Sequence, residues 1–377
     1  MRRSGSPQQP PGGTVVFNIQ PCLRDPLFGL LKDRWHLSPL AGAALFLVVY
    51  LGGNLGSAWL SGTALPREGL DLPFAQDRVA WVLHAFLLPV GAFLALRFFG
   101  QVESSFERLY TEGVTQAPIE EYNAFLQRLH RLYNSVALHA VAFGLAALAL
   151  GYLTLSNQFD GRRAWLDLDE GLGGIYQVAT GLVAWYAVHI VLLKVVITAG
   201  VMPRVFEWPV SFQPLHPDGC GGFRLFTEIA VTIAFFTAAT GTGVVLIVFA
   251  GAVRYGASVS TQPVLLALLL ESLTPLVFVS CLYRAHQVMS ANKEELLGQI
   301  HRAFQARFAA WHQSLRVGEL PEEQVEEVLR LESLHGVIRR LPVWPTNTQM
   351  MAQVLVSVAV PLALLAVQLL LERAVHL

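Results

Sequence analysis

Seven apolar segments, each long enough to cross a bilayer, constrain this chain of 377 residues more than any other feature. A hydrocarbon core of ~30 Å needs a helix of about 20 apolar residues. With 54% hydrophobic and 14% charged residues, the chain is also too apolar for a water-soluble protein of its size. The sequence therefore predicts an all-α fold, a polytopic transmembrane helical bundle. The seven predicted spans are residues 37–59, 79–99, 134–155, 173–199, 226–253, 261–283 and 350–371.

The basic residues are divided unevenly between the two sides of these spans. Of the 26 Lys and Arg residues, 20 are on the N-terminal side and 6 are on the other; the 20 are 18 in the N-terminal region and every second loop after it, with Arg97 and Lys194 in spans near that side. Because basic loops stay in the cytoplasm, we expect the N-terminus inside and the C-terminus outside. With a net charge of −1, the chain has no overall positive charge to attract nucleic acid. We therefore exclude nucleic acid as a partner.

The spans divide the chain into four predicted regions. The first is rich in Pro, Gly, Ser and Gln, which favours a flexible tail. The third begins as an amphipathic helix, with apolar residues every three or four positions from Leu297 to Leu315. Gly318 ends that helix and Pro321 starts a second one, which predicts a cytoplasmic hairpin. The regions are the tail 1–24, spans one to six with short loops at 25–283, the hairpin 284–349, and the last span with a short external tail at 350–377.

The loop before span three is expected to be helical. Pro118 suits a first helical turn, and Glu120 and Glu121 suit the helix dipole. No breaker residue follows, so we expect this helix to continue into span three.

An ionisable side chain at membrane depth is costly, so each one is a functional hypothesis. Glu271 lies about ten residues into span six, near the midplane. Pro275 frees the backbone carbonyl of Glu271 and kinks the helix there. A carboxylate beside a free carbonyl can bind a cation or carry a proton; the alternative is a structural pair that holds the bundle together.

Four further residues complete the predicted ion or proton pathway. They are His84, His139, His189 and Glu228. Among them, His189 in span four is the partner of Glu271 that we would test first. The histidines lie at different depths, which argues against a metal site. Lys194 is expected to extend to the inner headgroups. No catalytic residue, cofactor or metal is predicted.

The loop between spans four and five has the density of Pro and Gly that marks a defined turn. His216, Asp218 and Arg224 are its candidate functional residues. The loop is either a gate or ligand-binding elbow, or a rigid connector.

That loop reads His-Pro-Asp-Gly-Cys-Gly-Gly at 216–222, and Pro-Val-Trp-Pro stands at 342–345 before the last span. In these two short motifs the chain resembles an uncharacterised family of bacterial polytopic inner-membrane proteins. The resemblance implies a bacterial inner membrane and no particular activity.

Motifs for ATP binding, zinc hydrolysis and serine hydrolysis are missing from the sequence. We therefore expect a channel or transport protein, a homo-oligomer in the lipid bilayer, gated or assembled through its cytoplasmic helices. The alternative is a membrane-anchored signalling protein that docks a cytoplasmic partner through residues 290–340. A membrane enzyme for lipid-like substrates is the third candidate.

Overall fold

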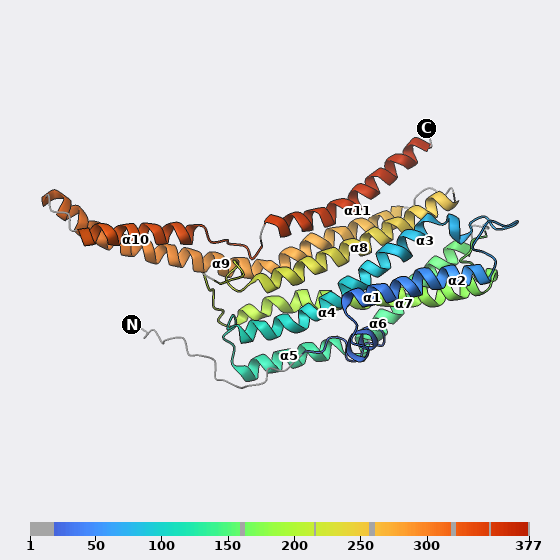
Figure 1. Cartoon of the computed structure of the whole chain (residues 1–377), viewed down its shortest axis with the longest axis horizontal. Helices are drawn as coiled ribbons and strands as arrows, with labels where there is room; N and C mark the ends of the chain where they lie inside the picture. Colours follow the sequence, from blue (N-terminus) through green and yellow to red (C-terminus); the bar gives the residue numbers. More distant parts are fainter. Residues whose placement is uncertain are drawn as a thin grey trace.

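The chain folds into a bundle of long helices, from which a helical hairpin projects at one end (Figure 1). The computed structural model describes residues 19–158, 163–214, 216–255, 261–317, 322–346 and 348–375. Across these ranges there are helices and loops, and no β-strand. The prediction of an all-α fold is confirmed.

Five helical stretches of the described residues are long and apolar enough to cross a membrane. They coincide with the first five predicted spans, so the chain is a multi-pass membrane protein. The sixth and seventh predicted spans fall in α9 (Thr261–Val317) and α11 (Thr348–Val375), and they stay predictions, as does the orientation. The five stretches are Pro39–Leu60, Arg78–Thr111, Ile119–Thr154, Leu172–Glu207 and Arg224–Leu246.

Spans one and two each contain a π-helical segment. In both, a polar side chain caps the start: Ser38 Oγ accepts from the Ala41 N–H at 3.2 Å, and Asp77 Oδ1 accepts from the Ala80 N–H at 3.0 Å. A wider π turn then interrupts the regular helix. Span one comprises α1 (Pro39–Phe46), η2 (Leu47–Gly52) and α2 (Gly53–Leu60), and span two comprises α3 (Arg78–Val82), η4 (Leu83–Leu87) and α4 (Leu88–Thr111).

The helix that was expected to run unbroken into span three is divided. It ends as α5 (Ile119–Tyr133) and starts again as α6 (Val136–Gln158). Asn134 donates to the Gln20 carbonyl at 2.9 Å and accepts from the Arg24 N–H at 2.9 Å. Ser135 Oγ then accepts from the Leu138 N–H at 3.1 Å. The division follows from these side chains, because Asn134 binds the N-terminal segment and Ser135 caps α6.

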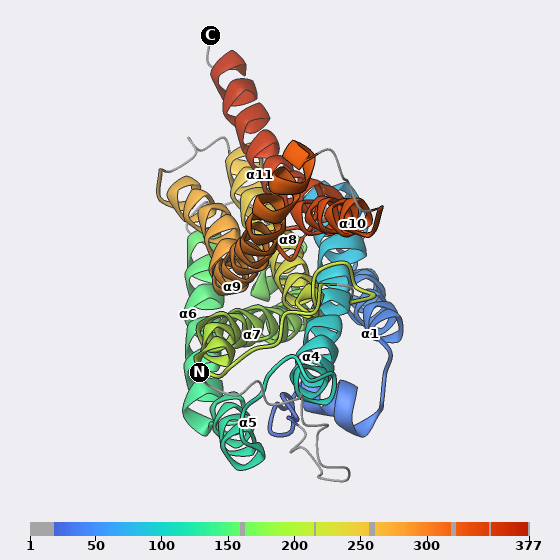
Figure 2. The same ribbon diagram turned by 90° about the vertical axis from the view of Figure 1, so that its left-hand side faces the viewer.

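Helices α7 (Leu172–Val201) and α8 (Arg224–Tyr255) form the centre of the bundle. Figure 2 shows α7 between α6 and α4, with α8 beside it. Helix α8 packs against α4, α9 and α11. Buried apolar side chains on these two helices join one continuous core, which includes Ile190, Val191, Val195, Ile229, Ile233 and Ala234.

The hairpin starts as a direct continuation of the sixth predicted span. Helix α9 is 57 residues long and leaves the bundle, and α10 (Glu322–Arg339) packs back along it (Figure 1). The return segment is fastened to the bundle: Lys293 Nζ donates to the Leu341 carbonyl at 2.7 Å, and the Thr227 hydroxyl donates to the Pro345 carbonyl. We call this end of the bundle the hairpin end and the opposite one the far end.

The N-terminal segment is part of the core from its first described residue. Ile19, Cys22, Asp25 and Phe28 are each at most 3% exposed. Residues 19–24 therefore do not belong to the tail predicted at 1–24, because they fill the space between α5 and α7. Residues 1–18 lie outside the described residues.

Candidate functional site

A buried ion pair lies at the hairpin end of α7. Lys194 Nζ donates to Asp25 Oδ2 at 2.8 Å and to the Pro21 carbonyl at 3.0 Å, and both charged side chains are 0% exposed. The ammonium also lies 5.0 Å from the centre of the Phe99 ring, a cation–π distance. The expectation that Lys194 reaches the headgroups is wrong, because the N-terminal segment supplies its partners inside the bundle.

The ion pair belongs to a chain of hydrogen bonds. The Tyr186 hydroxyl donates to Asp25 Oδ1 at 3.5 Å, and His139 Nδ1 lies 2.9 Å from the same hydroxyl. His139 Nε2 is enclosed and has no hydrogen-bond partner. Four ionisable or polar side chains from three elements are thereby joined: His139 of α6, Tyr186 and Lys194 of α7, and Asp25. We call this set the Lys194 chain.

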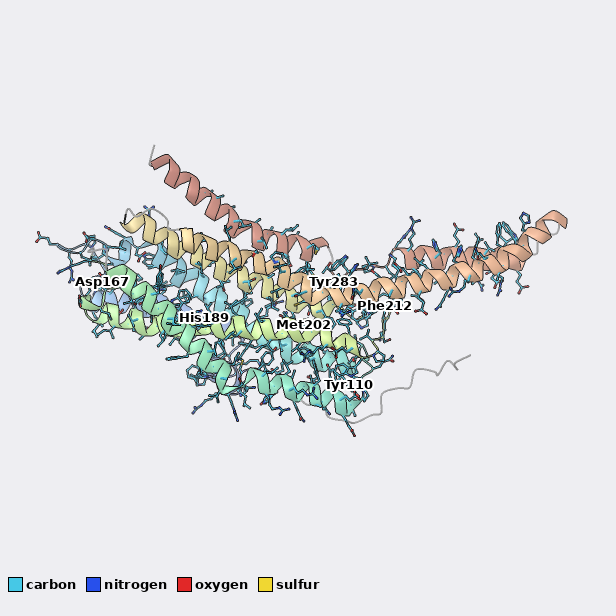
Figure 3. The ribbon with its side chains drawn as sticks, turned by 180° about the vertical axis from the view of Figure 1, so that it is seen from behind. Tyr110, Asp167, His189, Met202, Phe212 and Tyr283 are labelled. Carbon is cyan, nitrogen blue, oxygen red and sulfur yellow. The ribbon has the colours of Figure 1, made fainter. Side chains whose placement is uncertain are left out.

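Helix α7 positions the Lys194 chain through its own periodicity. Tyr186 and Lys194 are eight residues apart, about two turns, so they lie on one face. Thr198, one turn further on, donates to the Lys194 carbonyl and therefore accepts from the Tyr133 hydroxyl at 2.6 Å. Lys194 lies between His189 and Met202, which Figure 3 labels along the bundle.

Of the four predicted pathway residues whose side chains the structure describes, only His139 is part of the Lys194 chain. His189 Nδ1 bonds to the Trp185 carbonyl of its own helix at 2.7 Å. Glu228 pairs with Arg224 at 3.2 Å, one turn apart on α8. The side chain of Glu271 lies outside the described part of the structure, so its pairing with His189 stays a prediction although α7 contacts α9.

The fifth residue, His84, is buried at the far end. It belongs to η4 and lies near Trp165, whose loop closes that end of the bundle. His84, His139 and His189 thus make separate contacts. Among the described residues, no three His, Cys, Asp or Glu side chains are grouped as metal ligands would be.

The predicted turn at 216–224 is organised around Asp218. Its Oδ1 accepts from the Cys220 N–H at 2.7 Å, its Oδ2 accepts from the Gly222 and Arg224 N–H groups at 3.0 and 3.2 Å, and His216 Nδ1 lies 2.9 Å away. Burial by itself raises the pKa of the Asp218 carboxyl, but these hydrogen bonds outweigh it and lower the pKa. Both carboxylate oxygens are occupied by the turn, which supports the rigid connector.

Two glycines of this turn are required by close contacts. Gly221 has φ of +69°, and a Cβ there would lie 2.2 Å from the Phe212 ring; Gly222 has φ of +94° and faces Val114. The loop also pairs with the loop between spans two and three, since the Ser211 N–H donates to the Val114 carbonyl at 2.8 Å. The two loops are therefore joined at the hairpin end.

Asp25 and Tyr186 are the members of the site that sequence reasoning missed. A lysine inside a span signals a buried counter-ion, and that signal was available at Lys194. Its partner is not identifiable by spacing, since Asp25 precedes it by 169 residues. Comparisons with protein-family models, with curated proteins and with solved structures gave no match, so the site is assigned from geometry alone.

Proposed function

We propose that this multi-pass membrane protein is a channel or transport protein for protons or small cations. The observation that carries the proposal is the Lys194 chain, which places a carboxylate, an ammonium, a phenol and an imidazole in one hydrogen-bonded series inside the bundle. Buried ionisable groups in membrane helices mark proton relays and ion paths. Transport rather than simple cohesion is favoured by the unpartnered Nε2 of His139, because that atom can take up a proton.

The order of bonds defines a route for a proton. A proton received at His139 Nε2 allows Nδ1 to release its own proton to the Tyr186 oxygen. The Tyr186 hydroxyl then passes its proton to the Asp25 carboxylate. Neutralising Asp25 weakens its hold on Lys194, so proton arrival is coupled to the contact between the N-terminal segment and α7.

The hairpin completes the proposal as its assembly or gating element. We place the protein in a bacterial inner membrane as a homo-oligomer with a cytoplasmic N-terminus, in line with its charge distribution. The hairpin would then lie in the cytoplasm, connected to α8 and α9 by the Leu341 and Pro345 carbonyls.

Proton flux through the Lys194 chain is tested with Tyr186→Phe. This change removes the hydroxyl that passes the proton and keeps the ring, so proton flux into liposomes with a pH-sensitive dye should be lost. The matched control is Tyr176→Phe, since Tyr176 also lies on α7 but donates to the Val49 carbonyl outside the chain. Equal flux through the Tyr186→Phe variant and the wild type would contradict the proposal.

A second function, the docking of a cytoplasmic protein, is favoured by the exposed apolar side chains of the hairpin. Phe308 is 40% exposed on α9, and Leu329, Leu334 and Val337 are 45–57% exposed on α10. Apolar side chains that stay exposed on a helical hairpin in water mark a surface for binding another protein.

A further inference from the structure

The far end of the bundle holds a buried histidine that takes no part in the Lys194 chain. His84 is 4% exposed, and its Nδ1 is enclosed without a hydrogen-bond partner. Leaving a buried polar atom unpaired costs ~1–3 kcal/mol, so such an atom in a native fold requires an explanation. His84 therefore needs a role beyond filling space.

Both helices around His84 widen into π turns at this level. Segment η2 of span one contacts η4 of span two, and the rings of Tyr50 and His84 are 6.3 Å apart across that contact. Short π segments are rare and are concentrated at functional sites. One turn after Tyr50, Asn54 is fully buried; its Nδ2 donates to the Tyr50 carbonyl, but its Oδ1 has no partner. Two facing spans thus each present an unpartnered polar atom.

Burial and a nearby carboxylate act in opposite directions on the charge of His84. The Trp165 ring meets the imidazole edge to face at 6.4 Å, and its Nε1 donates to Asp77 Oδ2 at 2.9 Å. Helix α8 also packs on η4, where Gly243 faces Leu83 and Leu87. The charged or titratable groups that face His84 from the described elements are therefore one acid, Asp77, and one phenol, Tyr50.

We propose that His84 is a proton-binding site, separate from the Lys194 chain and at the opposite end of the spans. Burial opposes the charged imidazolium, and the Asp77 carboxylate is the described group that favours it. This inference goes beyond the proposed function, because proton binding at His84 does not require that ions cross the membrane.

Trp165 provides the test, because protonated imidazole quenches indole fluorescence at contact distance. The chain has 8 tryptophans, so the difference in emission between the wild type and Trp165→Phe, both in nanodiscs, isolates Trp165. This emission should fall on acidification from about pH 8 to about pH 4, a range on both sides of the ordinary histidine value of ~6.5. In a His84→Gln background the fall should disappear.

The matched control is His189→Gln, since His189 lies in the neighbouring α7 with its Nδ1 already bonded to Trp185. It should leave the fall in Trp165 emission unchanged. A fall of equal size in the His84→Gln background overturns the proposal. If that variant does not fold, the wild type alone still tests the proposal. A Trp165 emission that stays constant over the same pH range also overturns the proposal. No flux is measured, so the result is independent of the transport test.

Discussion

At the scale of single residues, the position of Lys194 is decided by partners that are remote in the sequence. Removing its charge from water is costly, and the cost is offset by Asp25, the Pro21 carbonyl and the Phe99 ring together. Lys194 does not extend along α7 toward the membrane surface because these partners come to it. The ion pair thereby fastens the N-terminal segment to the centre of the bundle.

A double-mutant cycle on the ion pair tests this view. Lys194→Met should lower the free energy of unfolding by about 3–5 kcal/mol, because Asp25 is then buried without a counter-charge. Asp25→Asn combined with Lys194→Met should lose clearly less than the sum of the two single losses, since no uncompensated charge remains. Unfolding in mixed micelles titrated with denaturing detergent measures all four proteins. Strictly additive losses would contradict a direct interaction.

At the scale of elements, the loops at the hairpin end behave as structural units. The Asp218 turn supplies acceptors for three backbone N–H groups, and the last of them, at Arg224, begins α8. A carboxylate in this position complements the positive end of the α8 dipole. The turn is therefore an N-terminal cap for α8 as well as a connection between spans.

The pH dependence of this turn follows from the lowered pKa of Asp218. A group whose pKa is lower in the folded state stabilises the fold above its ordinary value of 3.8, and that stabilisation is lost as the pH falls through the lowered value. The protection of the Cys220, Gly222 and Arg224 amides, measured relative to the intrinsic exchange rate at each pH, should thus be high at neutral pH and fall in acid. Asp218→Ala should remove the protection at every pH, by about 1.5–3 kcal/mol for hydrogen bonds to a charged group. His216→Gln serves as the control.

The His216→Gln control separates the contact of His216 with Asp218 from the contacts of the three backbone N–H groups. His216 touches the carboxylate from the side, whereas the three N–H groups hold both oxygens. His216→Gln should therefore keep most of the protection. Amide exchange in Asp218→Ala that matches the wild type at neutral pH would show that the turn does not depend on the carboxylate.

At the scale of the whole molecule, the outside of the bundle is apolar and the hairpin is mixed. Leu40, Val136 and Leu148 are each more than 70% exposed, which fits contact with lipid. On the hairpin, ion pairs such as Arg307 with Glu327 at 2.7 Å alternate with the exposed apolar side chains. In the proposed topology the bundle surface faces lipid and the hairpin lies in water, where a soluble protein can reach it.

Deleting residues 290–340 separates the two roles proposed for the hairpin. If the hairpin assembles the homo-oligomer, the mass of the protein in nanodiscs should fall from that of a symmetric oligomer to that of a smaller species. If it docks a cytoplasmic partner, the mass stays the same and a co-purified soluble protein is lost. A monomeric wild type would remove the support for a pore formed between subunits.

The sequence predicted the class of fold well and the site only in part. Apolar length alone predicted the first five spans, because backbone hydrogen bonds in lipid leave no alternative to a helix. The break at Asn134 and the burial of Ile19, Pro21 and Cys22 were not predictable, since each depends on contacts between segments more than 100 residues apart. His139 was predicted as a pathway residue without its partners, Tyr186 and Asp25.

The sequence by itself thus determined that this chain is a multi-pass helical membrane protein, because hydropathy acts locally and over the length of one span. Only the tertiary structure decided which polar groups meet. Lys194 is paired with Asp25, Asp218 is bound to its own turn, and His84 is buried in one π segment that contacts another. The physical reason is that a buried charge or polar atom pairs with a group that lies close to it in space, and the number of residues between two groups does not determine that distance.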